Sequence, residues 1–439
     1  MRLVSLWVFV LLMLWPVLGL QLDLGQALEA AEESNPKAPV GSTGQSVVSL
    51  PDSLLVQPSL LWTRRFDEIE GVTMSIDGSR VLVTTGLDVG GEHVNKRHIV
   101  SRQGEEIGTS MGKGGVLSGD GKRVIGVAAV EDLQGKTLEL LEGSPIESGE
   151  EEWVIYSPAR DYFAVEPSYE ADHAFLRVYD ARTGELLWKM DGPEHTFLTA
   201  SFCSEETLAA YTEGKVSLYD VRTGKKYWEK FLWLVGESAS YPAQLATSPS
   251  GQIAALLHKS AYLPSESYSK RESRIYSLSR GGDVRWEYKC SKWGWLAISP
   301  DGRYVAAHFG ETLFLFDNDT GHVLWQRGFD FMYPPQGAAF SADDKVLFIA
   351  GYLSGDERRY KTQANGAGKE LTWTKSTLYA FDVQGNVVWR RPVEAVVGDV
   401  DLEVLVGGNY LLVRDMDDLH MFDVSKLTAR AVGGRSHEK

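Results

Sequence analysis

Gly108–Gly112 (GTSMG) matches the Gly-x-Ser-x-Gly turn that presents a nucleophilic serine in many hydrolases. That turn requires a parallel strand before it and a helix after it, so that the serine is exposed at the top of a sheet. Here the segment lies between two stretches that read as antiparallel β-structure. We therefore expect Ser110 to be structural and the match to be accidental.

Two other segments carry groups that could bind a metal ion. Asp317–Gly321 (DNDTG) is similar to a metal loop, but the same Asp-x-x-Thr-Gly pattern recurs at Asp180–Gly184, which indicates a hairpin turn. His93 and His98 fall in an expected loop, and nine scattered histidines favour a solvated loop over a metal site. Asn318 begins a glycosylation sequon, which is meaningful only if the source is eukaryotic.

The Asp-x-x-Thr-Gly turn is part of a longer repeat of two short strands that ends in tryptophan. Its clearest copy is Leu176–Met190, LRVYDARTGELLWKM. Asp and Thr hydrogen-bond the local backbone, Gly accepts a positive φ, and Trp supplies an apolar face for a neighbouring sheet. Further copies occur at Leu218–Trp228, Leu315–Trp325, Ala380–Trp389 and, in a degenerate form, Ser277–Trp286.

A second repeat, a strand followed by a Ser-x-Asp-Gly turn and an apolar strand, precedes each hairpin. Its copies begin at Ser75, Ser118, Ser157, Ser248, Ser299 and Ser341, with two degenerate members at Phe202–Tyr211 and Val406–Arg414. Their spacing of roughly 40–50 residues is the period of a four-stranded propeller blade. The sequence therefore predicts an all-β fold, a single β-propeller of four-stranded blades. Eight is the expected count, and seven competes because the second blade, at about Gly115–Gly149, has the weakest pattern.

The ring is expected to be closed by an N-terminal strand. Leu60–Phe66 (LLWTRRF) is similar to the last strand of a blade, Val323–Phe329 (VLWQRGF), yet it precedes every first strand. The last repeat lacks its own fourth strand after Leu419–Val424. Pairing these segments would cover two sheet edges at once.

The chain ends divide into distinct segments. Residues 1–20 are one basic residue followed by an apolar run, which predicts a signal peptide or an uncleaved signal anchor. We assign residues 21–59 to a short helix and linker, 60–432 to the propeller and 433–439 to a disordered tail. The formal net charge of −16 argues against nucleic-acid binding. The expected location is extracytoplasmic: periplasmic, secreted, or held on the outer side of a membrane by the anchor.

Ser299–Ala307 (SPDGRYVAA) and Val178–Trp188 (VYDARTGELLW) together resemble the repeats of quinoprotein-type, PQQ-like eight-bladed propellers. This family includes dehydrogenases that use pyrroloquinoline quinone (PQQ) and cofactor-free relatives that act in outer-membrane assembly. For a dehydrogenase the resemblance implies PQQ on the axis over a Trp floor, Ca²⁺ held by Glu, Asn and Asp, and often an adjacent Cys pair. No such set can be matched here, and Cys203 and Cys290 are the only cysteines. We expect no cofactor and two unpaired thiols, with a disulfide as the alternative.

The strongest functional signal is the placement of the insertions. The B–C loops and D–A links of a propeller lie on one face, and long surface loops on a rigid scaffold commonly carry recognition. The long B–C loops are Gly86–Lys96, Glu166–His173, Lys259–Ser273 and Tyr352–Lys375. The residue types favoured at binding hot spots occur there as Trp233, Tyr241, Tyr262, Tyr268, Tyr333, Arg358, Arg359, Tyr360, Lys361 and Trp373.

These patterns predict an exported, non-enzymatic scaffold or receptor that binds a protein, peptide or glycan partner through the B–C/D–A face. The alternative is a PQQ-dependent quinoprotein dehydrogenase with its cofactor and Ca²⁺ on the propeller axis. A hydrolase or lyase that uses carboxylates in the central funnel is a third possibility. If the loops only decorate the scaffold, their aromatic residues pack back onto it.

Overall fold

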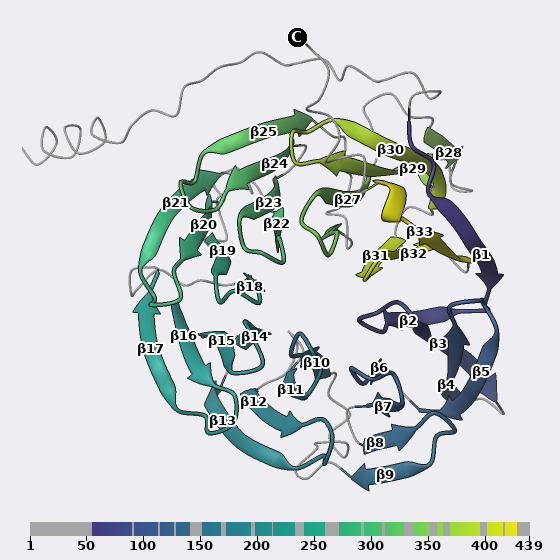
Figure 1. Ribbon diagram of the computed structural model, residues 1–439, viewed down its shortest axis with the longest axis horizontal. Helices are drawn as coiled ribbons and strands as arrows, with labels where there is room; N and C mark the ends of the chain where they lie inside the picture. Colours follow the sequence, from purple (N-terminus) through teal and green to yellow (C-terminus); the bar gives the residue numbers. More distant parts are fainter. Residues whose placement is uncertain are drawn as a thin grey trace, which may run out of the picture. The chain divides into compact units, whose positions relative to one another are not determined.

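The repeats form antiparallel strands that pair into eight separate sheets. The computed structural model describes residues 55–89, 92–112, 115–126, 129–140, 152–167, 173–194, 198–212, 214–232, 241–259, 272–290, 294–309, 312–328, 338–351, 358–362, 369–395, 402–415 and 418–427. All of these belong to the compact unit Ser49–Lys439. In Figure 1 the sheets surround a central opening, with the first strand of each sheet innermost and the last outermost. The all-β propeller is confirmed, and its blade count is eight.

The blades are numbered in chain order, and their strands run A to D from the centre outward. Blade 1 comprises β2 (Ile69–Met74), β3 (Arg80–Val89), β4 (Glu92–Ser101) and β5 (Glu106–Met111), and blade 2 comprises β6 (Val116–Leu117), β7 (Arg123–Ile125), β8 (Ala129–Asp132) and β9 (Thr137–Leu140). Blade 3 comprises β10 (Glu152–Tyr156), β11 (Tyr162–Pro167), β12 (His173–Asp180) and β13 (Leu186–Glu194), and blade 4 comprises β14 (Leu198–Phe202), β15 (Thr207–Thr212), β16 (Lys215–Asp220) and β17 (Lys226–Phe231). Blade 5 comprises β18 (Tyr241–Thr247), β19 (Ile253–Lys259), β20 (Glu272–Leu278) and β21 (Val284–Cys290), and blade 6 comprises β22 (Gly294–Ile298), β23 (Tyr304–Phe309), β24 (Thr312–Asp317) and β25 (Val323–Gly328). Blade 7 comprises β26 (Ala338–Phe340), β27 (Val346–Gly351), β28 (Arg358–Thr362), β29 (Lys369–Asp382) and β30 (Val387–Ala395), and blade 8 comprises β31 (Leu402–Gly407), β32 (Tyr410–Asp415), β33 (Asp418–Asp423) and β1 (Ser59–Arg65).

The Ser-x-Asp-Gly motif closes the A–B turns through local hydrogen bonds. In blade 1 the Ser75 hydroxyl donates to the Asp77 carboxylate at 2.8 Å and accepts the backbone N–H of Arg80 at 3.0 Å. Gly78 has a φ of 67°, a conformation that glycine adopts without steric cost. The same serine contacts occur at Ser118, Ser299 and Ser341. Because every partner lies within the motif, the sequence alone predicts the turn.

Tryptophans of the outer strands join each blade to the next. Trp188 in β13 donates its indole N–H to the carbonyl of Val221, in the C–D turn of blade 4, at 2.7 Å. Its ring covers Gly224, which has a φ of +66°, and a Cβ there would lie 2.8 Å from the ring. Glycine is thus required both by the backbone conformation and by the contact. The same arrangement joins Trp62 to Arg102 and Gly104, Trp228 to Arg280 and Gly282, Trp286 to Asn318 and Gly321, and Trp325 to Val383 and Gly385.

Blade 2 departs from this pattern on both sides. The tryptophan position of β5 is Gly108, opposite Ile99, and that of β9 is Glu139, opposite Val130. A Cβ at Gly108 would lie 2.5 Å from the carbonyl oxygen of Leu133, so backbone packs on backbone there. The strands of blade 2 are only two to four residues long. Its predicted weakness is therefore real, although it forms a complete four-stranded blade.

A buried ion pair supplies part of the contact between blades 1 and 2. Arg97 in β4 and Glu131 in β8 lie 2.5 Å apart, with side chains 4% and 14% exposed. Breaking such a pair leaves an uncompensated buried charge, which typically costs about 3–5 kcal/mol. This interface thus combines a small apolar cluster (Leu82, Ile99, Leu117 and Val124) with a polar contact, where five others have the tryptophan contact.

The N-terminal strand closes the ring, as predicted. β1 pairs antiparallel with β33, from Ser59 opposite Asp423 to Arg65 opposite Asp418. On its other side Trp62 donates to Arg102 of blade 1 at 2.8 Å. Arg64 in the same strand donates to the carbonyl of Gly104 and to the Glu106 carboxylate, at 3.0 and 2.9 Å. One strand therefore joins the last blade to the first.

Two segments that the sequence analysis predicts to be loops contain β-strand. Gly86–Lys96 continues the ladder of β3 and β4, which reaches Val89 opposite Glu92. Tyr352–Lys375 contains β28 and the beginning of β29, so blade 7 has five strands. Gly90 and Gly91 interrupt the first stretch, and Gly355, Gly366 and Gly368 interrupt the second, which favours the loop interpretation. Residues 1–20, 21–54 and 433–439 of the predicted terminal segments lie outside the described residues.

The two cysteines lie in separate blades and form no disulfide, as expected. Cys203 is fully buried in the core between blades 4 and 5, and burial raises the pKa of its thiol to about 12. Cys290 is half-buried at the end of β21. In the part of the chain that the structure describes, no helix has the length and apolarity needed to span a bilayer.

We predict that deleting residues 1–66 destabilises the propeller, whereas deleting residues 1–54 does not. The longer deletion removes β1 and with it two buried aromatics, Trp62 and Phe66, which are 9% and 6% exposed. Loss of one such side chain costs about 3–5 kcal/mol. Thermal denaturation and size-exclusion chromatography of both variants measure the effect. An unchanged melting temperature after the longer deletion would contradict ring closure by β1.

Candidate binding face

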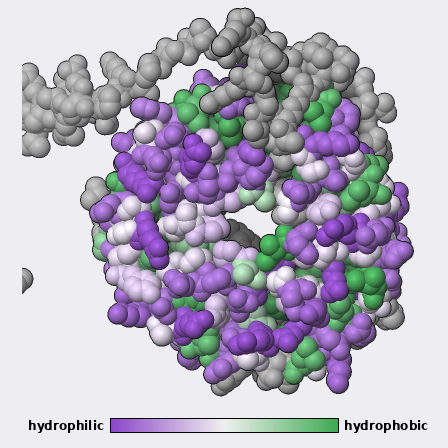
Figure 2. Space-filling model, viewed as in Figure 1, coloured by the Kyte–Doolittle hydropathy of each residue, from purple (hydrophilic) through white to green (hydrophobic). Residues whose placement is uncertain are grey.

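The two faces of the ring carry different connections. Strand direction alternates within a blade, so the A–B and C–D turns share one face, here called the turn face. The B–C and D–A connections share the opposite face, here called the loop face. In the view of Figure 2 the ring surface is mainly hydrophilic around a central opening, and hydrophobic residues are scattered singly over it. Single exposed apolar residues do not mark a binding site.

Side chains on the turn face contact neighbouring blades. Glu205 in blade 4 accepts the hydroxyl of Ser157 in blade 3 at 2.7 Å and replaces the Asp that this turn lacks. Arg160, at a φ of 59°, donates to the carbonyls of Leu117 and Met74, in blades 2 and 1, at 2.7 and 2.5 Å. These groups complete turns and strand ends of other blades. The turn face therefore serves ring assembly.

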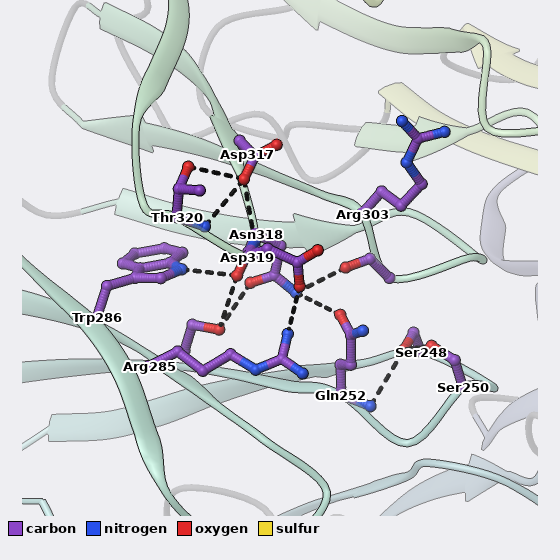
Figure 3. Close-up of polar contacts among 12 residues, drawn as sticks. Ser248, Ser250, Gln252, Arg285, Trp286, Arg303, Asp317, Asn318, Asp319 and Thr320 are labelled. Atoms are coloured by element: carbon purple, nitrogen blue, oxygen red, sulfur yellow. Dashed lines mark hydrogen bonds and ion pairs between the residues drawn. The ribbon is translucent and has the colours of Figure 1, made fainter.

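Asn318 provides a further such contact, between blades 5 and 6 (Figure 3). Its amide nitrogen donates to Gln252 and to the carbonyl of Gly302, both at 2.7 Å, and its amide oxygen accepts the Ser277 hydroxyl at 2.7 Å. Its backbone carbonyl accepts the indole N–H of Trp286 at 2.8 Å. Asn318 is fully buried and both amide protons are used. A sugar cannot be attached to this side chain in the folded protein.

The DNDTG segment is a turn, as predicted. Asp317 accepts the backbone N–H groups of Asp319 and Thr320 and the Thr320 hydroxyl at 2.7–3.2 Å (Figure 3). Burial alone would raise the pKa of Asp317, but these hydrogen bonds outweigh it and the pKa is lowered. Asp220 makes equivalent contacts in blade 4. Within the described ranges, no group of three or more His, Cys, Asp and Glu residues could hold a metal ion.

The remaining motif residues are also structural. Ser110 is buried in β5 and packs on Gly135, where a Cβ would lie 2.3 Å from the Ser110 Cβ. His98 lies in β4 and not in a loop, which corrects the sequence interpretation. Its Nδ1 is 3.0 Å from the Glu106 carboxylate, and its ring contacts Phe66 edge-on at 5.2 Å. His98 therefore supports the closure strand.

The loop face carries a projecting hairpin on blade 7, here called the blade 7 hairpin (β28 and residues 369–374). β28 continues the direction of β27 and pairs with β29, from Arg358 opposite Thr374 to Thr362 opposite Lys369. β30 pairs with β29 only from Thr374 onward. At about 3.3 Å per residue, β29 extends roughly 16 Å beyond that pairing. The hairpin thus rises above the body of its own blade.

Blade 1 carries a second projecting hairpin, here called the blade 1 hairpin (residues 86–89 and 92–95). Its pairs begin at Gly86 opposite Asn95 and end at Val89 opposite Glu92. β2 and β5 reach only Thr85 and Lys96, so the hairpin extends roughly 13 Å farther. Blade 8 lies between these hairpins in Figure 1. Its β32–β33 ladder ends early, at Asp415 opposite Asp418.

Charge distinguishes the blade 7 hairpin from the rest of the chain. β28 contains Arg358, Arg359 and Lys361 and no acidic residue. Residues 369–374 add Lys369 and a single acid, Glu370. The chain as a whole has a formal charge of −16. A local excess of positive charge on an acidic protein is suited to an anionic partner.

The structure brings together half of the predicted binding residues. Arg358, Arg359, Tyr360 and Lys361 are consecutive in β28, and Arg359 is the Cα partner of Trp373 in β29. Tyr241 is elsewhere, at the start of β18 in blade 5, opposite His258. The others lie outside the described residues: Trp233, Tyr262, Tyr268 and Tyr333. The blade 7 hairpin is therefore the coherent part of the predicted site.

Glu166 is a titratable group near the loop face that sequence reasoning missed. It is 3% exposed at the end of β11, and its carboxylate accepts the backbone N–H of Ala200 in blade 4 at 2.7 Å. Burial raises the pKa of Glu166 to about 8, against the opposing effect of that hydrogen bond. Gln244 makes a similar contact between blades 5 and 6, accepting the N–H of Leu296 at 2.7 Å. In sequence, a glutamate beside a loop suggests only a solvated charge.

The described residues do not fit PQQ with Ca²⁺. A Trp floor would have to face the axis, but every tryptophan side chain that the structure describes packs between blades or in a core cluster: Trp62, Trp188, Trp228, Trp286, Trp295, Trp325 and Trp389. Carboxylates able to hold a cation do not converge within the described ranges either. We derive no step through this cofactor.

The fold and repeats define an eight-bladed propeller of quinoprotein-type repeats. Residues 172–352 match the family model described as outer membrane protein assembly factor BamB, whose propeller is cofactor-free. The predicted resemblance is thus confirmed from β12 of blade 3 to β27 of blade 7. A search of curated proteins finds no match.

Solved structures show similar folds at low identity. BamB from Moraxella catarrhalis is 11% identical, with 84% of this chain and 100% of that chain covered and a TM-score of 0.40. A eukaryotic initiation factor is 12% identical, with 74% and 78% covered and a TM-score of 0.47. The computationally designed Ika8 protein is 13% identical, with 84% and 98% covered and a TM-score of 0.50. Similarity at this level concerns the fold alone.

We predict that Glu166→Gln removes a pH dependence of stability. A carboxyl with a raised pKa binds more protons folded than unfolded, so its contribution to the free energy of unfolding falls as pH rises from about 4.5 to about 8. Glutamine keeps the acceptor without the charge, as Gln244 does. The variant should therefore melt higher than the wild type at pH 9, with a smaller difference at pH 5.

Melting curves at both pH values measure this, with the exposed Glu185→Gln as the matched control. Equal pH dependence in wild type and Glu166→Gln would show that Glu166 is charged at pH 7.

Proposed function

We propose that this protein is a non-enzymatic scaffold that binds a partner protein through its loop face, with the blade 7 hairpin as the main recognition element. The observation that carries the proposal is the match of residues 172–352 to the family of an outer membrane protein assembly factor. That factor acts in the assembly of other proteins. The proposal extends this kind of role to the present chain.

The asymmetry of the ring supports the loop face as the binding surface. Side chains on the turn face, such as Glu205 and Arg160, are used in contacts between blades. The loop face carries the projecting hairpins, including Arg359 opposite Trp373. Arginine supplies a planar fork of donors, and tryptophan supplies rigid apolar area. Both residue types are enriched at protein-binding hot spots.

We also propose an extracytoplasmic location. The support is the apolar run in residues 1–20, which has the character of an export signal. The similarity to an outer membrane assembly factor points to the same compartment. A glycan partner would use the same residue types, but the family match favours a protein.

We predict that replacing residues 352–375 with Asn-Gly removes partner binding and leaves the propeller folded. Gly351 is opposite Thr377 in the retained ladder, so Asn-Gly together with Ser376 makes a three-residue connection that can close the shortened blade. The melting temperature should change by less than about 3 °C, since the described residues that are removed pair with β30 only through Thr374 and Lys375. Pull-down from the native compartment, with identification of captured proteins, measures the loss.

The matched control shortens the blade 1 hairpin by replacing residues 87–94 with Asn-Gly, which retains the pair Gly86–Asn95. This control variant should lose less partner binding in the pull-down than the blade 7 replacement does. Unchanged partners after the blade 7 replacement, with the fold preserved, would contradict the assignment of this hairpin.

We propose that the protein uses no quinone. Added PQQ with Ca²⁺ should leave the melting temperature unchanged, because the described residues offer neither a Trp floor nor a carboxylate cluster. A ligand at a hundred times its Kd stabilises a protein by about 2.7 kcal/mol, which a melting curve detects. An upward shift that requires both PQQ and Ca²⁺ would instead support the dehydrogenase alternative.

A further inference from the structure

β28 is an edge strand on the loop face. Among the described residues it pairs only with β29, from Arg358 to Thr362. Alternate backbone N–H and C=O groups on its other side are therefore available for a further ladder. That side faces the position of an A strand.

The described part of the A strand of blade 7 does not reach this edge. β26 comprises only Ala338–Phe340 and pairs with Leu347–Ile349 of β27. β28 begins opposite Thr374, which is five residues along β29 from Tyr379, the partner of Ile349, so β28 lies beyond the end of that pairing. The sheet therefore has an A strand at its base and, in the described part of the chain, an uncovered edge at its top.

Charge restricts what could pair with this edge. Three of the five residues of β28 are Arg or Lys, and none is acidic. Edge cations discourage pairing with like-charged strands, including a second copy of β28. The same cations attract a strand that carries carboxylates, because opposite charges across a ladder stabilise pairing by about 0.2–1 kcal/mol each.

Outer D strands also have edges that no described strand covers. β1 and β25 contain arginine and no acidic residue, but the charge of three other D strands differs from that of β28. β13, β17 and β21 each contain both acidic and basic residues. Mixed charge provides no preference for an acidic strand over a basic one. β28 differs from these three because its charges are all positive.

We propose that β28 is the docking edge for an acidic, extended segment of a partner protein, which adds to blade 7 as an extra antiparallel or parallel strand. Main-chain hydrogen bonds provide the affinity in this mode, and side chains select the partner. The inference rests on the proposed scaffold function and specifies how the blade 7 hairpin would recognise its partner.

The test uses the full chain and a fluorescent synthetic peptide that alternates glutamate with valine or threonine. Fluorescence anisotropy measures affinity, and hydrogen–deuterium exchange locates the contact. The peptide should bind and slow amide exchange in Arg358–Thr362. The same peptide N-methylated at alternate residues keeps its charges but loses backbone donors along one edge, and it should bind at least tenfold more weakly. A lysine version should not bind.

Charge reversal in the protein provides the second arm. Arg358→Glu, Arg359→Glu and Lys361→Glu combined should weaken peptide binding at least tenfold. The matched control reverses three exposed lysines of blades 3 and 4, Lys189→Glu, Lys225→Glu and Lys230→Glu, with the same change in net charge. Its affinity should stay within twofold of the wild type. Melting curves verify that both variants fold, and the N-methylated peptide requires no variant.

Each contrary result overturns the proposal. Equal affinity of the N-methylated peptide would mean that charge alone binds the peptide, and unchanged affinity after reversal in β28 would place the contact elsewhere. Absence of binding by the acidic peptide would also reject strand addition. The scaffold function is tested separately. If replacement of residues 352–375 removes the native partner while the acidic peptide does not bind, the hairpin remains the recognition element and only the strand-addition mode is wrong.

Discussion

The contact between an outer-strand tryptophan and the turn glycine of the next blade is the interaction on which this ring depends. A sheet of four short strands is marginal alone and must bury both faces against neighbours. The Trp286 ring covers Gly321, and its N–H donates to the carbonyl of Asn318 at 2.8 Å. Trp62 and Trp325, which make the same contact, are 9% exposed, and truncating a tryptophan as buried as these costs about 3–5 kcal/mol. Since the contact recurs at five interfaces, the blades form one rigid support for the loop face.

The same constraint explains where the ring departs from regularity. Gly108 and Glu139 occupy the tryptophan positions on either side of blade 2, and the contact with blade 1 includes the buried Arg97–Glu131 pair instead. An ion pair in low dielectric gains little over apolar packing. We therefore expect blade 2 to be held less firmly than blades 3 to 7, which the tryptophan contact joins and which include the blade that carries the blade 7 hairpin. A rigid scaffold under a projecting edge reduces the ordering cost of binding.

Local motifs predicted the blades because each turn is closed by its own residues, as Ser75 and Asp77 show. Ring closure was also predictable, since β1 repeats the pattern of other D strands. The contacts between blades were not, because partners such as Glu205 and Ser157 are distant in sequence and follow no pattern. The hairpin extensions were interpreted as loops because glycines interrupt both stretches of sequence. The burial of Glu166 depends on a neighbouring blade and has no sequence signal.

The central claim, that the tryptophan–glycine contact determines how firmly each blade is held, is tested most directly by native-state hydrogen exchange. The measurement compares the slowest amides of β7 and β8 in blade 2 with those of β15 and β16 in blade 4, which is bounded by Trp188 and Trp228. We expect blade 2 to exchange through an opening of clearly lower free energy than blade 4. Equal protection of the two blades, or stronger protection of blade 2, would contradict the account.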